Sequence, residues 1–207
     1  MPHLLYVESS PRKQRSASIE VAHAYIDAWK AKHPGGTVDT LDVWATPMPE
    51  FDGDAMEAKY AGLAGQALTP SQQAAWDGIR KIADRFHKAD VIVMGVPMWN
   101  FGIPYKLKHL IDAVSQKDVL FTFDERGLNG LLGGRRIVIV AARGVGLDDF
   151  PRAQFDYQES YMTAWAKMVG ITDIHIVPVE KLLYGPDADA ASRAAAKKEA
   201  AALAAAA

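Results

Sequence analysis

Serine hydroxyls in one N-terminal segment could hold an anion. The segment ESSPRKQRSAS, residues 8–18, carries Ser9, Ser10, Ser16 and Ser18, together with basic residues. A helical pattern starts at its end, and the free N–H groups of a helix N-terminus attract negative charge. The alternative is that Ser16 or Ser18 only caps this helix. Because the segment contains no glycine, it matches neither GxGxxG nor GxxxxGK[ST], and it suits one terminal phosphate held by side chains and amides.

A second segment, PMWNFGIP at residues 97–104, could bind a flat aromatic ring. Met98, Trp99 and Phe101 offer apolar and aromatic contact to such a ring. Asn100 and the backbone N–H groups could form hydrogen bonds in the ring plane. The alternative is that Trp99 and Phe101 belong to the core or to an interface.

A third segment, ARGVG at residues 142–146, places Gly144 and Gly146 where backbone can approach a ring closely. The alternative is a plain turn that leaves a strand. If the three segments lie together, they describe a site for a mononucleotide, with a phosphate at one end and a planar ring at the other. Flavin mononucleotide (FMN) has that shape.

Each of these segments follows an apolar run that predicts a strand. The predicted strands cover residues 3–7, 37–44, 90–96, 135–142 and 173–179. Helical periodicity between them predicts helices at residues 16–32, 69–87, from 104 onward and at 154–169. This alternation predicts an α/β fold, a parallel sheet with helices on both faces. Ligands of such sheets bind beyond the carboxyl ends of the strands, where the three segments would meet.

Two stretches lie outside this alternation. Residues 45–69 form a long connection with Gly and Pro, which is typical of a lid or a binding loop. Residues 188–207 are rich in alanine and predict a last surface helix with a frayed end. Residues 1–207 are expected to form a single domain.

Composition narrows the function classes. The chain has 207 residues, a formal net charge of −2 and no cysteine, which gives no case for nucleic acid, disulfides or thiolate chemistry. No apolar run is long enough to span a membrane, and no signal peptide is recognisable, so a cytoplasmic protein is expected. The six histidines are scattered without metal-ligand spacing, so we predict no metal site.

The sequence resembles the FMN-dependent NADH-azoreductase and quinone reductase family over nearly its whole length. The resemblance is carried by ESS, SAS, LTPSQQ, PMWNF, LKHLID, ARGVG, GITDI and YGPD. It implies a flavodoxin-like three-layer sandwich whose five-stranded parallel sheet has the order 2-1-3-4-5. It also implies tightly bound FMN, with NADH or NADPH as electron donor.

The resemblance further implies which residues form the site. The implied cofactor-binding residues are Ser10, Ser16, Ala17, Ser18, Pro97, Met98, Trp99, Asn100, Phe101, Ala142, Arg143, Gly144 and Val145. Three of them depart from the family pattern, which often has Tyr for Trp99, Ser for Ala142 and Gly for Val145. The family also implies a homodimer whose substrate pocket includes Phe121, Phe123, Lys59 and Tyr60.

The function that follows is an FMN-dependent oxidoreductase. NADH or NADPH would pass a hydride to flavin N5 and leave, and a quinone or azo compound would then take two electrons in the same slot. No protein residue is expected to be catalytic in this ping-pong scheme. The alternatives are a flavodoxin-like electron carrier, an NAD(P)H:FMN reductase that releases reduced flavin, and an α/β protein that binds no flavin.

Overall fold

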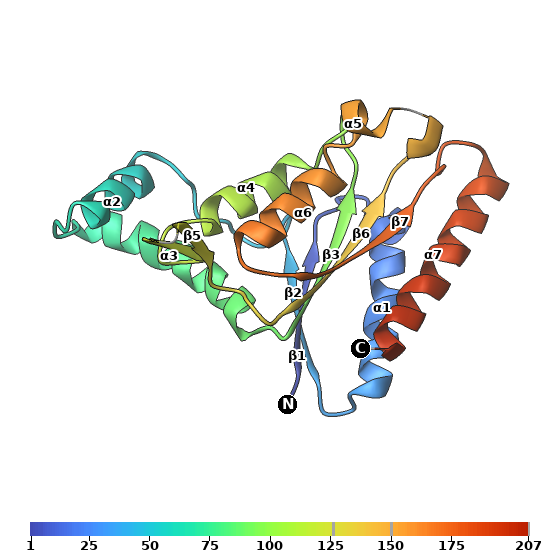
Figure 1. Cartoon of the computed structure of the whole chain (residues 1–207), viewed down its shortest axis with the longest axis horizontal. Coiled ribbons are helices and arrows are strands. Elements are labelled where there is room, and N and C mark those ends of the chain that lie inside the picture. The colour runs from blue at the N-terminus through green and yellow to red at the C-terminus, as the bar shows by residue number, and fades with distance from the viewer. Residues whose placement is uncertain (126, 150, 207) are drawn as a thin grey trace.

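A five-stranded parallel sheet forms the centre of the computed structural model, which describes residues 1–125, 127–149 and 151–206 (Figure 1). Its strands are β1 (His3–Glu8), β2 (Thr37–Asp42), β3 (Val91–Pro97), β6 (Arg136–Ala142) and β7 (Asp173–Val179). They lie in the order β2-β1-β3-β6-β7, which in chain order of these five strands is 2-1-3-4-5. The predicted flavodoxin-like sheet is therefore confirmed, and the order in which successive strands join the sheet reverses between β1 and β3.

Helices cover both faces of the sheet (Figure 1). On one face lie α1 (Ala17–Lys32) and α7 (Pro186–Ala206), and on the other lie α3 (Pro70–Lys88), α4 (Tyr105–Val114) and α6 (Glu159–Met168). Successive strand residues alternate between these two cores: Leu5 and Ile92 face α3 and α4, whereas Leu4 and Val93 face α1. Burial on both faces explains why the strand segments are nearly continuous in apolar residues.

Residues 45–69 contain a helix that the sequence did not predict. This helix, α2 (Gly53–Leu63), begins at Asp52, whose side chain accepts a hydrogen bond from the Ala55 N–H at 3.2 Å. Only Ala55 and Ala58 are buried, against α3, so α2 lacks the large apolar stripe that marks an amphipathic helix. It lies at the end of the molecule farthest from α7 (Figure 1).

The predicted helix at 154–169 is interrupted. A short helix α5 (Arg152–Phe155) precedes α6, and Asp156 lies between them. Its carboxylate accepts hydrogen bonds from the N–H groups of Gln158 at 3.2 Å and Glu159 at 2.9 Å. A side chain that satisfies these free N–H groups starts a new helix at this point.

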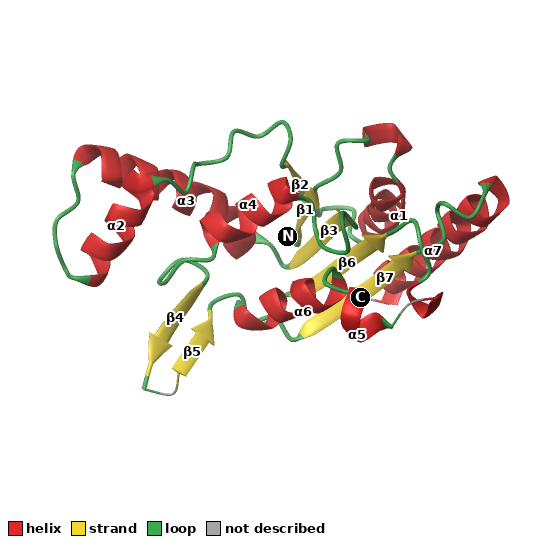
Figure 2. Cartoon of the chain, turned by 90° about the horizontal axis from the view of Figure 1, so that it is seen from above, coloured by secondary structure: helices red, strands yellow, loops and turns green. Residues whose placement is uncertain are grey.

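Phe121 and Phe123, implied by the resemblance to lie in the substrate pocket, belong to an antiparallel hairpin. Its strands are β4 (Phe121–Asp124) and β5 (Gly127–Gly130), and the hairpin projects away from the sheet (Figure 2). Gly130 lies against the Val169–Gly170 backbone, where an added Cβ would be 2.0 Å from the Gly170 nitrogen. This close backbone approach fixes the base of the hairpin.

The alanine-rich C-terminal segment is ordered by packing. Helix α7 starts at Pro186 and runs to Ala206, and Ala196, Ala200 and Ala204 are buried along its length. Small residues let α7 approach α1 closely, which supplies the burial that the sequence does not suggest. The expected frayed end is not observed within the described residues, because Lys32 Nζ on α1 donates to the Ala205 carbonyl at 2.8 Å.

Candidate functional site

The three predicted segments converge at the carboxyl ends of β1, β3 and β6. They form a cleft of about 220 Å³, here called the loop cleft. Its lining residues are Ser10, Arg12, Ser16, Ala17, Pro97, Met98, Trp99, Ala142, Arg143, Gly144, Leu182, Leu183, Asp189 and Arg193. The cleft adjoins the β1–β3 position at which the strand order reverses, as expected for ligands of parallel sheets.

One end of the loop cleft is the N-terminus of α1. Ser16 and Ser18 are buried, and their hydroxyl oxygens are 3.0 Å apart. In the described part of the chain Ser16 makes no side-chain capping hydrogen bond, although it occupies the N-cap position. The structure therefore disfavours the alternative in which Ser16 only caps the helix, and the first N–H groups of α1 can bind an anion.

The neighbouring residues of this loop have different tasks. The Ser9 hydroxyl donates to the Gly95 carbonyl at 2.6 Å and thereby ties the loop to β3. Lys13 forms ion pairs with Glu8 and Asp42, which compensate its positive charge on the β2 side of the loop. Ser10 is buried and its hydroxyl accepts from the Arg12 N–H at 3.4 Å, so Ser10 and Arg12 line the cleft itself.

The second segment makes a tight turn. Trp99 and Gly102 exchange two backbone hydrogen bonds, of 3.0 and 2.9 Å, around Asn100 and Phe101. Asn100 has φ 48° and Phe101 has φ 67°, and both angles lie in the left-handed region. Asparagine tolerates positive φ better than most non-glycine residues, whereas positive φ is unfavourable for a bulky residue such as phenylalanine, and such strain is concentrated at functional sites.

The two rings of this turn are half-exposed and belong to different clusters. Trp99 lies beside Trp44 and Tyr105, with ring centroids 5.9 and 6.3 Å away. Phe101 packs against Phe155 at 5.0 Å. Trp99 is 36% exposed and Phe101 is 39% exposed, so neither is a core residue, and both keep surface available for a ligand.

The third segment is anchored by a buried charge. The side chain of Arg143 is fully buried and donates to Glu180 at 2.8 Å, to the Gln158 amide oxygen at 3.1 Å, and to Glu159. The Arg143 N–H donates to the Val179 carbonyl at 2.9 Å. Arg143 therefore lines the cleft, but its Nε–H already donates to Glu180 and is not available to a ligand. Its positive charge is compensated by the carboxylates of Glu159 and Glu180.

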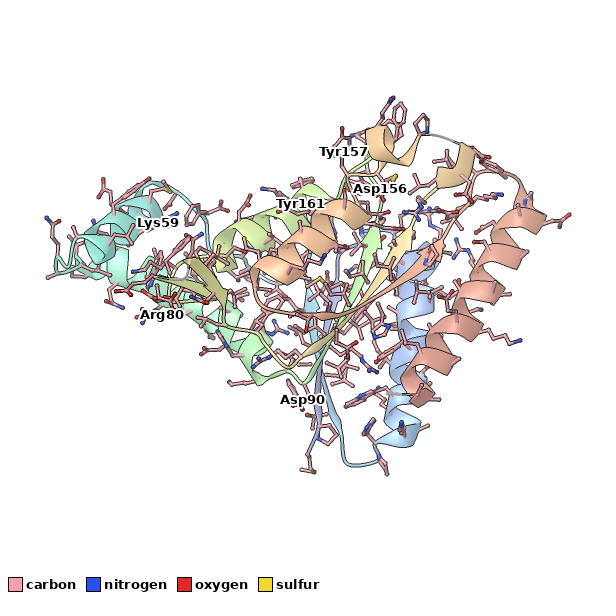
Figure 3. The ribbon with its side chains drawn as sticks, viewed as in Figure 1. Lys59, Arg80, Asp90, Asp156, Tyr157 and Tyr161 are labelled. Atoms are coloured by element: carbon pink, nitrogen blue, oxygen red, sulfur yellow. The ribbon has the colours of Figure 1, made fainter. Side chains whose placement is uncertain are left out.

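A larger cleft of about 810 Å³ begins on the other side of Trp99. It is lined by Glu50, Phe51, Trp99, Asn100, Gly102, Ile103, Tyr105, Lys108, His109, Asp112, Tyr157 and Tyr161. Figure 3 shows Tyr157 and Tyr161 at the α6 side of the molecule. Burial raises the pKa of Tyr161 still further above neutral pH, so its phenol is protonated there. Because Trp99 lines both clefts, they meet at the aromatic turn.

The predicted substrate-pocket residues are not brought to these clefts within one chain. Phe123 is 56% exposed on the projecting hairpin and packs against Phe121 at 5.6 Å. Lys59 and Tyr60 lie on α2 and line neither of the two clefts. Figure 3 shows Lys59 at the end of the molecule that lies farthest from α7. The Lys59 ammonium lies 5.9 Å from the ring centroid of Phe51, which does line the larger cleft.

The sequence reasoning missed one side of the loop cleft. Leu182 and Leu183 follow β7, and Asp189 and Arg193 lie on α7. Arg193 donates to Asp189 at 2.6 Å and to Glu20 of α1 at 2.8 Å. The YGPD segment marks the loop after the fifth sheet strand, and the rule that ligands bind at carboxyl ends could have included this loop.

Comparison with known proteins decides the family. A family model described as flavodoxin-like fold matches residues 2–204. FMN-dependent NADH:quinone oxidoreductase 2 of Pseudomonas syringae pv. tomato is 50% identical over 205 residues, which cover 99% of this chain and 98% of that protein. The chain belongs to the FMN-dependent NADH:quinone oxidoreductase family. FMN-dependent NADH:quinone oxidoreductase 9 of Burkholderia lata is similar too, at 51% identity over 89% of this chain and 90% of that protein.

Solved structures extend the family likeness to three dimensions. The azoreductase of Bacillus anthracis strain Sterne superimposes with a TM-score of 0.90 at 27% identity, covering 99% of both chains. An FMN-dependent NADH-azoreductase of Bacillus anthracis strain Ames Ancestor, solved in complex with FMN, gives a TM-score of 0.86 at 25% identity. It covers 99% of this chain and 100% of that chain. The family predicted from the sequence motifs is confirmed.

Among the described residues, no group of three or more His, Asp or Glu side chains is arranged to hold a metal ion. None of the helices that the structure describes is both long and apolar enough to cross a membrane.

Proposed function

We propose that this member of the family is an FMN-dependent oxidoreductase that passes two electrons from NADH to a quinone. The observation that carries the proposal is the loop cleft, where an uncapped helix N-terminus, a strained aromatic turn and a glycine-bearing loop meet. The names of the curated relatives support NADH and quinones, and the similar azoreductases support azo compounds as further acceptors. The chain forms one domain, because the hydrophobic cores on the two faces share a single sheet.

The described residues fit FMN at both of its ends. Ser10, Ser16, Ala17 and Ser18 hold the phosphate through buried hydroxyls and the first N–H groups of α1. The ring system is bounded by residues 97–101 and by residues 142–145. In this arrangement Arg143 acts by fixing the position of its loop, because its side chain is turned into the network with Glu159 and Glu180.

When bound, FMN would carry two electrons from the nicotinamide donor to the acceptor. The protein supplies position and a water-poor surface. Trp99 and Phe101 present exposed ring faces to flat substrates, and the Asn100 amide provides both a donor and an acceptor beside them. The donor and the acceptor use this surface in turn.

A homodimer completes the substrate pocket. Phe123 projects from its own chain on the hairpin, and Tyr105 and Tyr157 are exposed beside the larger cleft. Because Phe123, Lys59 and Tyr60 line neither the loop cleft nor the larger cleft of their own chain, they reach a substrate there only in a second copy. Complementation tests this arrangement with two variants, Ser16→Ala/Ser18→Ala and Phe123→Ala.

Each variant alone should have low quinone reductase activity, for lack of cofactor or of the aromatic wall. Subunits exchanged between the two variants should recover activity, because one site of each mixed dimer is then native in both of its parts. No recovery in a mixture shown to contain mixed dimers would contradict a shared site.

The enzymatic proposal is tested with the purified protein. Anaerobic mixing of the FMN-loaded protein with NADH should bleach the flavin absorbance rapidly, and benzoquinone should restore it. Initial-rate plots against both substrates should be parallel lines. Slow bleaching would favour an electron carrier, and loss of FMN after reduction would favour a reductase that releases flavin. A protein that takes up no FMN would refute the proposal.

A further inference from the structure

The loop after β7, residues 180–185, forms an unpredicted wall of the loop cleft. Main-chain hydrogen bonds join it to the third segment: Leu182 N–H donates to the Arg143 carbonyl at 3.4 Å, and Leu183 N–H donates to the Gly144 carbonyl at 3.0 Å. Lys181 has φ 62°, which turns the chain sharply before these bonds. The position of Leu183 is therefore set by backbone contacts and does not depend on its side chain.

Side chains join the two loops a second time. The Tyr184 hydroxyl donates to the Asp149 carboxylate at 2.5 Å and accepts from the Gly146 N–H at 3.4 Å. The Glu180 carboxylate, which also binds Arg143, accepts from the Leu147 N–H at 3.4 Å. Residues 180–185 and residues 143–149 are thus held as one unit at the edge of the cleft.

The side chain of Leu183 lies directly over Gly144. A Cβ added to Gly144 would be 2.5 Å from Leu183 Cδ1 and 2.7 Å from Cγ, so the space that a side chain would take is already filled. Leu183 is nevertheless 82% exposed, although it lines the same cleft as Met98 and Trp99. A flat ligand bound in this cleft would bury part of that leucine surface, and burial of apolar surface favours binding.

We infer that Leu183 is an apolar cover that packs against bound FMN and slows its release, with Gly144 kept free of a side chain to admit it. This inference rests on the proposed function. The contact lies on the loop after β7, whereas the residues expected to bind the cofactor lie on the other three loops. Retention of the cofactor is therefore set partly by the last strand–helix connection.

The experiment compares the FMN dissociation constants of variants, measured by quenching of flavin fluorescence. Leu183→Ala removes most of the apolar surface that FMN would bury and should weaken FMN binding about tenfold. Leu63→Ala is the matched control, because Leu63 is also an exposed leucine but lies on α2, away from the loop cleft. Its FMN binding should equal that of the wild type.

A double-variant cycle tests the pairing with Gly144. Gly144→Ala alone should displace the Leu183 side chain and weaken FMN binding, whereas adding it to Leu183→Ala should cost little, because the space is then open. Equal costs in both backgrounds would refute the pairing. Thermal unfolding without FMN should be unchanged in Leu183→Ala, since the side chain is exposed.

Failure of the Leu183 cover and failure of the proposed function give different FMN-binding results. If the wild type binds FMN and Leu183→Ala binds it with the same affinity, the cover is refuted and the proposed function stands. If the wild type binds no FMN, the proposed function fails and the cover fails with it.

Discussion

Gln158 and Arg143 form a buried hydrogen bond that links the ends of two strands. The Gln158 amide oxygen accepts from Arg143 Nη1 at 3.1 Å, and the Gln158 amide nitrogen donates to the Val96 carbonyl at 2.8 Å. Gln158 and Arg143 are both fully buried, so no solvent replaces a lost partner. One side chain at the start of α6 thereby holds the aromatic turn after β3 and the loop after β6 in a fixed relation.

Gln158→Ala should destabilise the protein by about 3 kcal/mol, because a buried carbonyl and part of a buried guanidinium each lose a partner. Urea denaturation measures the change. The control is Gln154→Ala, an exposed glutamine on the neighbouring α5, which should cost less than about 0.5 kcal/mol. Equal stabilities of the two variants would show that the buried network contributes nothing.

The strained turn at Asn100 separates a backbone role from a side-chain role. Asn100→Gly keeps the positive φ without strain and should leave the unfolding free energy within about 0.5 kcal/mol of the wild type. Asn100→Val places a β-branched residue at φ 48° and should cost about 2 kcal/mol. Chemical denaturation gives both values, and a Val variant as stable as the Gly variant would contradict the turn.

The flavin midpoint potential of the Asn100→Gly variant, measured by spectroscopic redox titration, then tests whether the Asn100 amide contacts the cofactor. The Gly variant retains the turn but lacks the Asn100 amide, so its bound flavin should show a changed midpoint potential. An unchanged potential would mean that the side chain makes no contact with the cofactor.

The base of the β4–β5 hairpin should not tolerate a side chain at Gly130. A Cβ there would lie 2.0 Å from the Gly170 backbone nitrogen, which cannot move aside as a side chain could. Gly130→Ala should therefore cost about 3 kcal/mol, equivalent to a fall in Tm of about 6–12 °C for a chain of this size. Gly133→Ala is the control, since its nearest contact would be an ordinary 3.7 Å. Differential scanning calorimetry distinguishes them.

The contact between α1 and α7 should weaken in acid. Hydrogen bonds from Lys197 and then from Arg193 hold the pKa of Glu20 below its usual value. A lowered carboxyl pKa stabilises the fold above the unfolded pKa of about 4.3, and this contribution disappears as the pH falls through the folded pKa. The group is partly exposed, so we expect only about 0.5–1 kcal/mol.

Glu20→Gln should lose this stability at pH 7 and show a smaller decline between pH 5 and pH 3, roughly the range around the carboxyl pKa. Glu199→Gln, on the exposed side of α7, should behave like the wild type. Urea midpoints measured across the pH range test the pair. A wild-type curve parallel to that of Glu20→Gln would argue against the ion pairs.

Hydrophobic pattern and turn chemistry suffice for the parts of this protein that are locally determined. The three site segments each follow a strand that is a nearly continuous apolar run. Helix α3 starts at Pro70, after Thr69 and Gln72 form a capping box. Because parallel strands bring their carboxyl ends to one edge, the order of these segments already predicts that Ser16, Asn100 and Gly144 lie near one another. The resemblance to the family added the cofactor and the strand order.

Tertiary contacts decided the rest. Helix α2 buries only the small residues Ala55 and Ala58, against α3, and α7 is stable as a helix over its alanines because α1 lies against it. The inward turn of the Arg143 side chain and the seat of Leu183 over Gly144 depend on partners about 15 to 40 positions away. A sequence determines where its own backbone can turn and which faces are apolar, whereas close packing between distant segments exists only once the sheet has brought them together.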